Sequence, residues 1–337
     1  MKFQKNISLK EYNTFGIDVI AEKFISVDTL SQLIEIITAH KDIFVLSGGS
    51  NILLTQNIKK PVVHINFKGK EFYEDKDDNN SIFVKVQAGE NWHEFVRWCL
   101  EQNLGGIENL SLIPGNVGTS PMQNIGAYGV EIKDVFHELE AVEITSNTVK
   151  KFDRQSCNFG YRESIFKNVD KNKFIIINVT FKLTKKDHTL NTSYGAIKEE
   201  LKKNNIKDPS IADVSNAVIA IRKSKLPDPK EIGNSGSFFK NPVIDVTHFN
   251  ILEQKYPGIP NYVISEDLVK IPAGWLIEQC GFKGKRFGNA GVHKNQALVL
   301  VNHGNVTGFE IYELSQKILK AVLDKFDIDL DTEVNIV

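Results

Sequence analysis

An antiparallel hairpin in the middle of the chain is the feature that most constrains the fold. Residues 135–152 form two runs of alternating apolar and polar residues, and Ser146, Asn147 and Thr148 lie between them. This pattern is typical of two strands joined by a turn. Helix patterns occur on both sides of it. A mixture of hairpins and helices predicts α+β lobes and argues against one doubly wound parallel sheet.

Helix starts and further strands are predicted around this hairpin. Asp28 is the expected N-cap of an early helix. Asn91 and Glu94 open a second helix in the manner of a capping box, and Thr307 and Glu310 open the last long one. Apolar strands are expected at Ile43–Leu46, Ile82–Ala88, Phe174–Leu183 and the C-terminal Ile328–Val337.

Two changes of composition predict domain boundaries. Near Phe67 an apolar strand gives way to the polar run 71–80. Near residue 224 a helix must stop, because Pro227 and Pro229 cannot continue it. We therefore expect three parts, 1–67, 68–223 and 224–327, followed by the strand 328–337.

Composition excludes several classes of function. The chain has 41 Lys+Arg against 42 Asp+Glu, so no net field favours nucleic acid or an anionic membrane. The N-terminus has no apolar signal-peptide segment, and the apolar runs are too short to span a bilayer. The three cysteines are scattered, and the histidines lack paired metal-ligand spacing. We expect a cytoplasmic protein with no metal, no nucleic-acid partner and no membrane partner.

Three glycine-rich loops carry the chemical information. The chain has neither GxGxxG nor GxxxxGK[ST], so a nucleotide would not be held by a Rossmann or Walker loop. The loops are SGGSN at 47–51, the long segment 113–129, and GNSGSFFKNP at 233–242. Glycines let backbone N–H groups approach an anion closely. Taken singly, each loop has a plainer interpretation: a tight turn, a surface Ω-loop and a bulge or turn.

Together these loops resemble the UDP-N-acetylenolpyruvoylglucosamine reductase family. The likeness extends over most of the chain through NTFG (13–16), SGGSN, PGNVGTSPMQNIGAYG (114–129), GYRESIF (160–166), KLPDP (225–229), GNSGSFFKNP and AGWLI (273–277). The resemblance implies a two-lobed FAD-binding portion of the vanillyl-alcohol-oxidase type, formed by 1–67 and 68–223. It also implies an α+β substrate-binding domain at 224–327, with the strand 328–337 returning to the flavin region. Tyr194-Gly195 matches the subtype that retains a substrate-capping loop.

The resemblance also implies a reaction. NADPH reduces non-covalently bound FAD, and the flavin delivers hydride to the vinyl carbon of UDP-N-acetylglucosamine enolpyruvate. The product is UDP-N-acetylmuramate, a precursor of peptidoglycan. We expect a monomer whose partners are these small molecules only.

Particular residues match the motif positions of the family. Arg162 is the expected cation for the substrate carboxylate, Ser237 the proton donor, and Glu333 an acid that keeps its proton. The residues expected to bind FAD are Ser47, Gly48, Gly49, Ser50, Asn51, Pro114, Gly115, Gly118, Ser120, Gln123, Asn124, Gly126, Ala127 and Arg222. Those expected to bind the sugar nucleotide are Tyr194, Lys225, Asn241 and Gln296.

Local sequence leaves simpler roles open for the same residues. Arg162 stands beside Glu163 and would suit a surface ion pair, and Glu333 would suit a solvated acidic tail. Lys225 would suit a solvated helix end. Ser235 lies two residues from Ser237, and in strand-like backbone the two hydroxyls would share a face.

Two other functional classes also stay open. A sugar or lactone oxidase on the same flavin fold often carries flavin attached through His or Cys, yet neither residue occurs in 47–51 or 113–129. A sugar-nucleotide binding protein without catalysis would need neither Arg162 nor a flavin loop.

Overall fold

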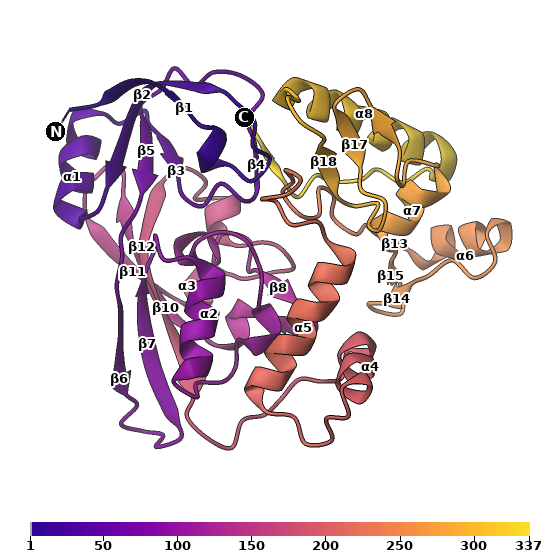
Figure 1. The fold of residues 1–337 in the computed structure, drawn as a ribbon, viewed down its shortest axis with the longest axis horizontal. Helices are drawn as coiled ribbons and strands as arrows, with labels where there is room; N and C mark the ends of the chain where they lie inside the picture. The colour runs from indigo at the N-terminus through magenta and orange to yellow at the C-terminus, as the bar shows by residue number, and fades with distance from the viewer. Residues whose placement is uncertain (1) are drawn as a thin grey trace. The chain divides into compact units, whose positions relative to one another are not determined.

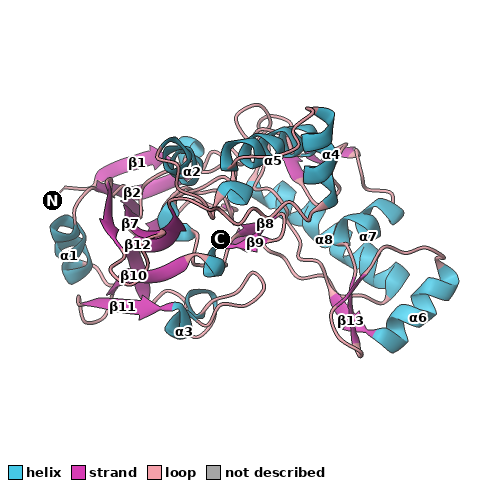
Figure 2. Ribbon diagram, turned by 90° about the horizontal axis from the view of Figure 1, so that it is seen from below, coloured by secondary structure: helices cyan, strands magenta, loops and turns pink. Residues whose placement is uncertain are grey.

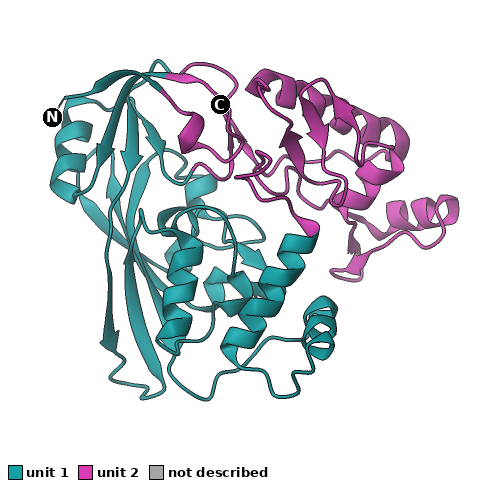
Figure 3. Ribbon diagram, in the orientation of Figure 1, with its two compact units in different colours: residues 1–7, 21–48, 58–224 teal, residues 8–20, 49–57, 225–337 magenta. Residues whose placement is uncertain are grey.

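The computed structural model describes residues 2–337, which divide into two compact units (Figure 3). Unit 1 comprises residues 1–7, 21–48 and 58–224, and unit 2 comprises 8–20, 49–57 and 225–337. Among residues 2–337, no helix combines the length and the apolarity needed to cross a membrane. The three-part division expected from the sequence stays a prediction.

A four-stranded sheet with order β1-β2-β5-β3 lies at the N-terminal end of the chain (Figure 1). Its strands are β1 (Gln4–Ser8), β2 (Ile20–Val27), β3 (Phe44–Leu46) and β5 (Val62–Ile65). β2 and β3 each run parallel to β5, and the helix α1 (Leu30–Ala39) makes the crossover from β2 to β3 that parallel strands require. The buried face of α1 packs with the apolar side chains of this sheet.

Unit 1 also contains a five-stranded antiparallel sheet. Its order is β11-β10-β12-β7-β6, with β6 (Lys70–Glu74), β7 (Ser81–Gln87), β10 (Phe136–Glu143), β11 (Val149–Asp153) and β12 (Phe174–Thr184). β10 and β11 are the hairpin predicted from the sequence, with Val142 opposite Val149. Hairpins and helices thus occur together, and the expected α+β class is confirmed.

The helix α2 (Trp92–Glu101) is tied to this sheet by aromatic packing. The Asn91 side chain accepts a hydrogen bond from the Glu94 backbone N–H, as the sequence predicts. The helix buries Trp92, and the Trp92 ring meets Phe181 of β12 edge-on at 5.8 Å between centroids. The indole Nε1 donates to the Leu110 carbonyl at 2.9 Å, so a buried polar atom is also satisfied.

Short elements and loops complete unit 1. They are η2 (Glu108–Leu110), η3 (Val117–Thr119), β8 (Gly126–Ala127), β9 (Val130–Glu131), η4 (Ile132–Asp134), α3 (Arg154–Cys157), η5 (Ile165–Lys167), α4 (Gly195–Lys203) and α5 (Ile211–Lys225). α4 lies beside α5 (Figure 2), and the apolar side chains of the two helices share one buried cluster.

Unit 2 combines two small sheets with three helices. One sheet has the order β13-β15-β14, with β13 (Val243–Asp245), β14 (Tyr262–Val263) and β15 (Leu268–Lys270). The other has the order β16-β17-β18, with β16 (Arg286–Phe287), β17 (Ala290–Val292) and β18 (Leu300–Asn302). The helices are α6 (Val246–Lys255), α7 (Ala273–Gln279) and α8 (Gly308–Phe326). The remaining elements are η1 (Lys10–Tyr12) and the parallel pair β4 (Ile52–Leu53) and β19 (Asn335–Ile336).

Two local predictions were wrong. The N-cap of α1 is Thr29, which shares a capping box with Gln32, whereas the Asp28 carboxylate accepts from the Asn66 side chain. The expected strand Ile328–Val337 is reduced to β19, because the strand with which it pairs, β4, is two residues long. The preceding residues contribute one isolated bridge, between Thr332 and Phe239.

A capping box at the start of α8 gives a stability prediction. The Thr307 hydroxyl accepts from the Glu310 N–H at 3.2 Å, and the Glu310 carboxylate accepts from the Thr307 N–H at 2.7 Å. We expect Thr307→Ala to lower the free energy of unfolding by about 1 kcal/mol, measured by urea denaturation. Thr307→Ser keeps the hydroxyl and should stay near the wild type. Equal stability of the Ala and Ser variants would contradict a role for the cap.

Candidate active site

Two glycine-rich loops, 47–51 and 113–129, meet backbone to backbone at Gly48 and Gly115, which both lie in unit 1. Gly48 follows β3, and a Cβ placed on it would lie 2.8 Å from the Gly115 Cα and 2.9 Å from the Asn116 nitrogen. The Ser47 hydroxyl accepts from the Asn116 side chain at 3.3 Å. Only glycine permits this approach at position 48. The contact therefore joins the SGGSN loop to the start of the segment 113–129.

The second of these loops is also held against the five-stranded sheet. A Cβ on Gly118 would meet the Ala88 Cβ at 2.5 Å, and the Gly118 N–H donates to the Ala88 carbonyl at 2.9 Å. Gly115 has φ +112°, a conformation that favours glycine. Ser120 is buried, and its hydroxyl donates to the Val117 carbonyl at 2.7 Å.

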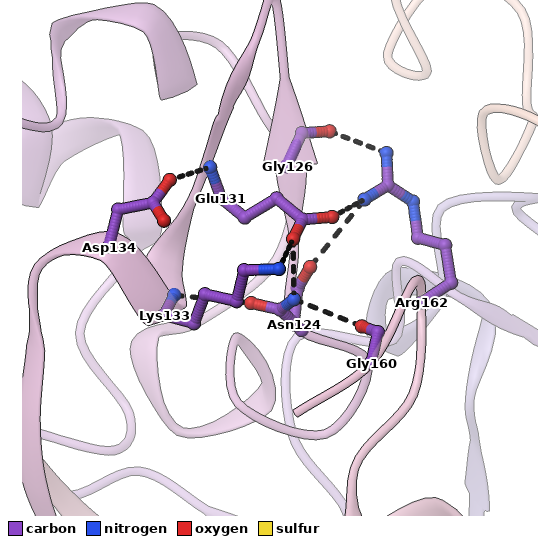
Figure 4. Close-up of polar contacts among 7 residues, drawn as sticks. All are labelled: Asn124, Gly126, Glu131, Lys133, Asp134, Gly160 and Arg162. Atoms are coloured by element: carbon purple, nitrogen blue, oxygen red, sulfur yellow. Dashed lines mark hydrogen bonds and ion pairs between the residues drawn. The ribbon is translucent and has the colours of Figure 1, made fainter. Parts of the chain in front are cut away.

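Arg162 is held in a strained backbone conformation by the next part of the same loop (Figure 4). Its φ is +56°, which is unusual for a residue with a long side chain. The guanidinium donates to the Gly126 carbonyl at 2.6 Å and lies 3.8 Å from the Glu131 carboxylate. It also lies over the Tyr161 ring, 5.3 Å from the centroid. Strain of this kind is retained where surrounding contacts impose it, and it marks candidate functional positions.

Asn124 and Glu131 organise the surroundings of Arg162. The buried Asn124 amide donates to the Glu131 carboxylate at 2.9 Å and to the Gly160 carbonyl at 3.0 Å. Its oxygen accepts from the Lys133 N–H at 3.1 Å, and the Lys133 ammonium pairs with Glu131 at 2.7 Å. Figure 4 shows that these side chains converge on one carboxylate. Sequence reasoning considered Glu163 as the partner of Arg162 and missed Glu131, which only the fold brings near.

A half-buried arginine, Arg222, lies elsewhere in unit 1, and its Nε is fully covered. Burial lowers the pKa of Arg222, whereas the charge and hydrogen bond of the Tyr128 hydroxyl raise it. No acceptor within residues 2–337 reaches the buried Arg222 Nε. A buried donor without a partner is costly, so a ligand oxygen or nitrogen would relieve it. The ring of Tyr194 meets that of Tyr128 edge-on at 5.3 Å.

In unit 2, the structure brings the backbones around Ser237 and Glu333 together. The Glu333 N–H donates to the Phe238 carbonyl at 2.8 Å, and the Phe238 N–H donates to the Leu298 carbonyl at 2.8 Å. Phe238 and Phe239 are buried, as expected for core residues. The Asn51 amide donates to the Glu333 carbonyl at 3.3 Å. Glu333 is half-buried and anchored by its backbone, so it does not belong to a freely solvated tail.

The spacing argument for Ser235 and Ser237 does not hold in the structure. Gly236 between them has φ +69°, so the backbone is not strand-like at this point. The Ser235 hydroxyl donates to the Ile52 carbonyl at 3.5 Å, whereas Ser237 forms a backbone bridge with Val299. The two serines therefore have different surroundings.

The four residues expected to bind substrate differ in their exposure and in their hydrogen bonds. Lys225 is exposed at the end of α5, and Tyr194 is 45% exposed at the N-cap of α4. The Asn241 oxygen accepts from the Ala273 N–H at 2.9 Å and so caps α7. The Gln296 oxygen accepts from the Leu298 N–H at 3.3 Å.

The remaining residues expected to bind FAD lie in the same loops. Gly49, with φ +57°, would clash with the Tyr12 carbonyl if it carried a Cβ, and Ala127 lies in β8. Pro114 is exposed, and Ser50, Gln123 and Ala127 are half-buried.

Two family models match the chain. The model of an FAD binding domain matches residues 23–152. The model of the C-terminal domain of UDP-N-acetylenolpyruvoylglucosamine reductase matches residues 228–337. Gly48, Gly115 and Gly118 all fall within the first match.

Full-length relatives carry the same reductase name. The chain is 57% identical to the UDP-N-acetylenolpyruvoylglucosamine reductase of Flavobacterium johnsoniae, with 100% of both chains covered. It is 43% identical to that of Pseudomonas aeruginosa, with 100% of this chain and 99% of the relative covered. The crystal structure of the reductase from Thermus caldophilus is similar, with a TM-score of 0.69 and 23% identity, and covers 100% of this chain and 99% of its own. The last likeness concerns the fold alone.

The loops of unit 1 fit the cofactor of the matched domain. Gly48 and Gly115 carry no side chains, and glycine-rich backbone of this kind can approach a diphosphate closely. The chain is an FAD-dependent oxidoreductase, and residues 23–152 supply its FAD binding domain.

The approach of Gly48 to Gly115 predicts a loss of flavin on substitution. We expect Gly48→Ala to purify with less flavin per polypeptide and to lose about 1–3 kcal/mol of stability, because the added methyl forces the loops apart. Gly195→Ala is the matched control, since a Cβ there would meet nothing within 4 Å. A Gly48→Ala protein with full flavin content and stability would show that the contact does not shape the flavin site.

Proposed function

The chain belongs to the UDP-N-acetylenolpyruvoylglucosamine reductase family, and on this premise we propose that it reduces UDP-N-acetylglucosamine enolpyruvate to UDP-N-acetylmuramate. NADPH is the proposed reductant and FAD the non-covalent cofactor. The 57% identity over the whole chain is the observation that carries this proposal. The reaction supplies a peptidoglycan precursor, and we propose that it takes place in the cytoplasm.

The proposed chemistry requires charge stabilisation by the protein. Bound FAD supplies the two-electron chemistry, by taking a hydride from NADPH and giving it to the terminal vinyl carbon. Negative charge then develops on the carbon beside the substrate carboxylate. A preorganised cation stabilises such charge most where water is excluded. Arg162 suits this role, because the Gly126 carbonyl and Glu131 already fix its guanidinium and its fork geometry matches a carboxylate.

Ser237 and Glu333 complete the proposed catalytic set. Ser237 gives a proton to the carbon that carries the developing charge. A hydroxyl is a weak acid, but an enolate is a strong base, so the transfer is feasible with imposed geometry. Glu333 donates a hydrogen bond to the same charge and must carry a proton to do so. The hydrogen bond between the Glu333 N–H and the Phe238 carbonyl supports joint action of the two residues.

Binding roles are proposed for residues that match the family motifs. Tyr194 and Lys225 would hold the diphosphate of the sugar nucleotide, Tyr194 as part of a capping loop. Asn241 and Gln296 would bind its polar groups. Arg222 would direct its unpaired Nε to the flavin. We propose that FAD is bound by two lobes, 1–67 and 68–223, and the UDP-sugar by the domain 224–327. The proposed active form is a monomer.

The proposed reaction is tested by following NADPH in the presence of the UDP-sugar. The flavin-loaded protein should consume one NADPH per UDP-N-acetylglucosamine enolpyruvate and form UDP-N-acetylmuramate. UDP-N-acetylglucosamine, which lacks the enolpyruvyl group, is the matched control and should not support consumption. NADPH oxidation that does not depend on the enolpyruvyl group would contradict the proposal.

Substitution of Ser237 should separate the two halves of the reaction. Reduction of the flavin by NADPH needs no proton on substrate carbon, so Ser237→Ala should leave that step nearly unchanged. Reoxidation by the UDP-sugar should slow by about 10²–10⁴, the usual loss when a general acid is removed. Rapid mixing with flavin absorbance measures both steps.

The neighbouring serine provides the control for that experiment. Ser235 makes its own contact with the Ile52 carbonyl, so Ser235→Ala should reoxidise at nearly the wild-type rate. Reoxidation at the wild-type rate in Ser237→Ala, or a slow Ser235→Ala, would overturn the assignment of the proton donor.

A further inference from the structure

Two asparagines tie the segment before Tyr194 to the glycine loop of unit 1. The side-chain nitrogen of Asn109 donates to the carbonyls of Tyr128, at 3.1 Å, and Asn191, at 2.8 Å. The side-chain nitrogen of Asn191 donates in turn to the Gly129 carbonyl at 3.0 Å. Side-chain amides thus join three separate stretches of the chain: η2, the end of the glycine loop and the segment before Tyr194.

The arrangement around these amides is tightly constrained. Asn109 is 1% exposed, and its side-chain oxygen has no partner within residues 2–337. A buried unpaired oxygen is costly, so the two bonds of the nitrogen must outweigh that cost to hold this orientation. Gly129 has φ +81°, and a Cβ there would lie 3.0 Å from the Asn191 nitrogen. Glycine at 129 therefore keeps room for Asn191.

A local contact follows two residues later. The Asn191 oxygen accepts from the Ser193 hydroxyl at 2.8 Å, just before Tyr194. Tyr194 is the N-cap of α4, and α4 packs through Ile197 and Leu201 on α5, as Figure 2 shows for the two helices. With both ends fixed, the position of Asn191 limits where Tyr194 can lie.

We propose that Asn191, supported by Asn109, is a positioning residue for substrate affinity. This inference rests on the proposed function, in which Tyr194 covers the diphosphate of a UDP-sugar. A segment already tied down at Asn191 loses less conformational entropy when Tyr194 closes on the ligand. In this proposal Asn191 acts on binding of the UDP-sugar and not on the chemical step.

Asn191→Ala tests the proposal in the flavin-loaded enzyme. The KM for the UDP-sugar should rise roughly three- to tenfold, with kcat and the KM for NADPH unchanged. This is the range expected for loss of one neutral hydrogen bond, here the bond to the Gly129 carbonyl that ties the segment to the glycine loop. UDP alone should bind more weakly by a similar factor in calorimetry. Trypsin cleavage after the exposed Lys198 should become faster, which reports loosening of the segment independently of turnover.

Two further variants complete the experiment. Asn204→Ala is the matched control and should behave as the wild type. Asn204 is the C-cap of α4, and its side-chain amide donates to Glu200, one turn back in the same helix. Gly129→Ala places a methyl group close to the Asn191 side-chain nitrogen, and it should also raise the KM for the UDP-sugar.

The outcomes separate this proposal from the proposed function. If Asn191→Ala is cleaved faster by trypsin but keeps the wild-type KM and UDP affinity, Asn191 has only a structural role, and the proposal is overturned. An equal rise in the KM for NADPH and in the KM for the UDP-sugar would also overturn the proposal. If the wild type itself fails to turn over the UDP-sugar, the proposed function has failed, and the role of Asn191 falls with it.

Discussion

A backbone-to-backbone contact is the constraint on which the cofactor-binding part of unit 1 depends. Gly48 and Gly115 are far apart in sequence, yet a single methyl on Gly48 would lie within 3 Å of the other chain segment. Contacts this close tolerate no side chain, so both loops must be glycine-rich at the point of approach. Gly118 approaches Ala88 in the same way, without room for a side chain, and this contact holds the same loop against the five-stranded sheet.

The segment that begins at this contact also carries the electrostatic part of the site. Its later residues Asn124 and Gly126 supply carbonyls to the Arg162 guanidinium, and Glu131, just beyond the segment, supplies the carboxylate. Tyr128 and Gly129 of the same segment anchor the approach to Tyr194. In the proposed function, this one irregular loop would contact the cofactor, hold the cation for the substrate charge and anchor the cap, and long irregular loops inside compact domains are usually functional.

Local patterns were sufficient for much of the fold. The caps of α2 and α8 and the β10–β11 hairpin depend on residues a few positions apart, so the sequence predicts them well. The predicted length of the C-terminal strand was wrong, because β19 pairs with the two-residue β4, which is distant in sequence.

The site residues also differ in whether local sequence or only the fold identifies them. Motifs singled out Arg162, Ser237 and Glu333, but Glu131, Asn109 and Asn191 act through contacts that only the folded chain creates. No local spacing marks them.

The fate of solvent hydrogen tests the central claim most directly. The account holds that the substrate carbon beside the carboxylate takes its proton from an exchangeable group, Ser237, and that hydride goes to the terminal carbon. With NADPH and the UDP-sugar in D₂O, nuclear magnetic resonance of the product should show one deuterium on the carbon beside the carboxylate. A product with only protium at that carbon would contradict the account.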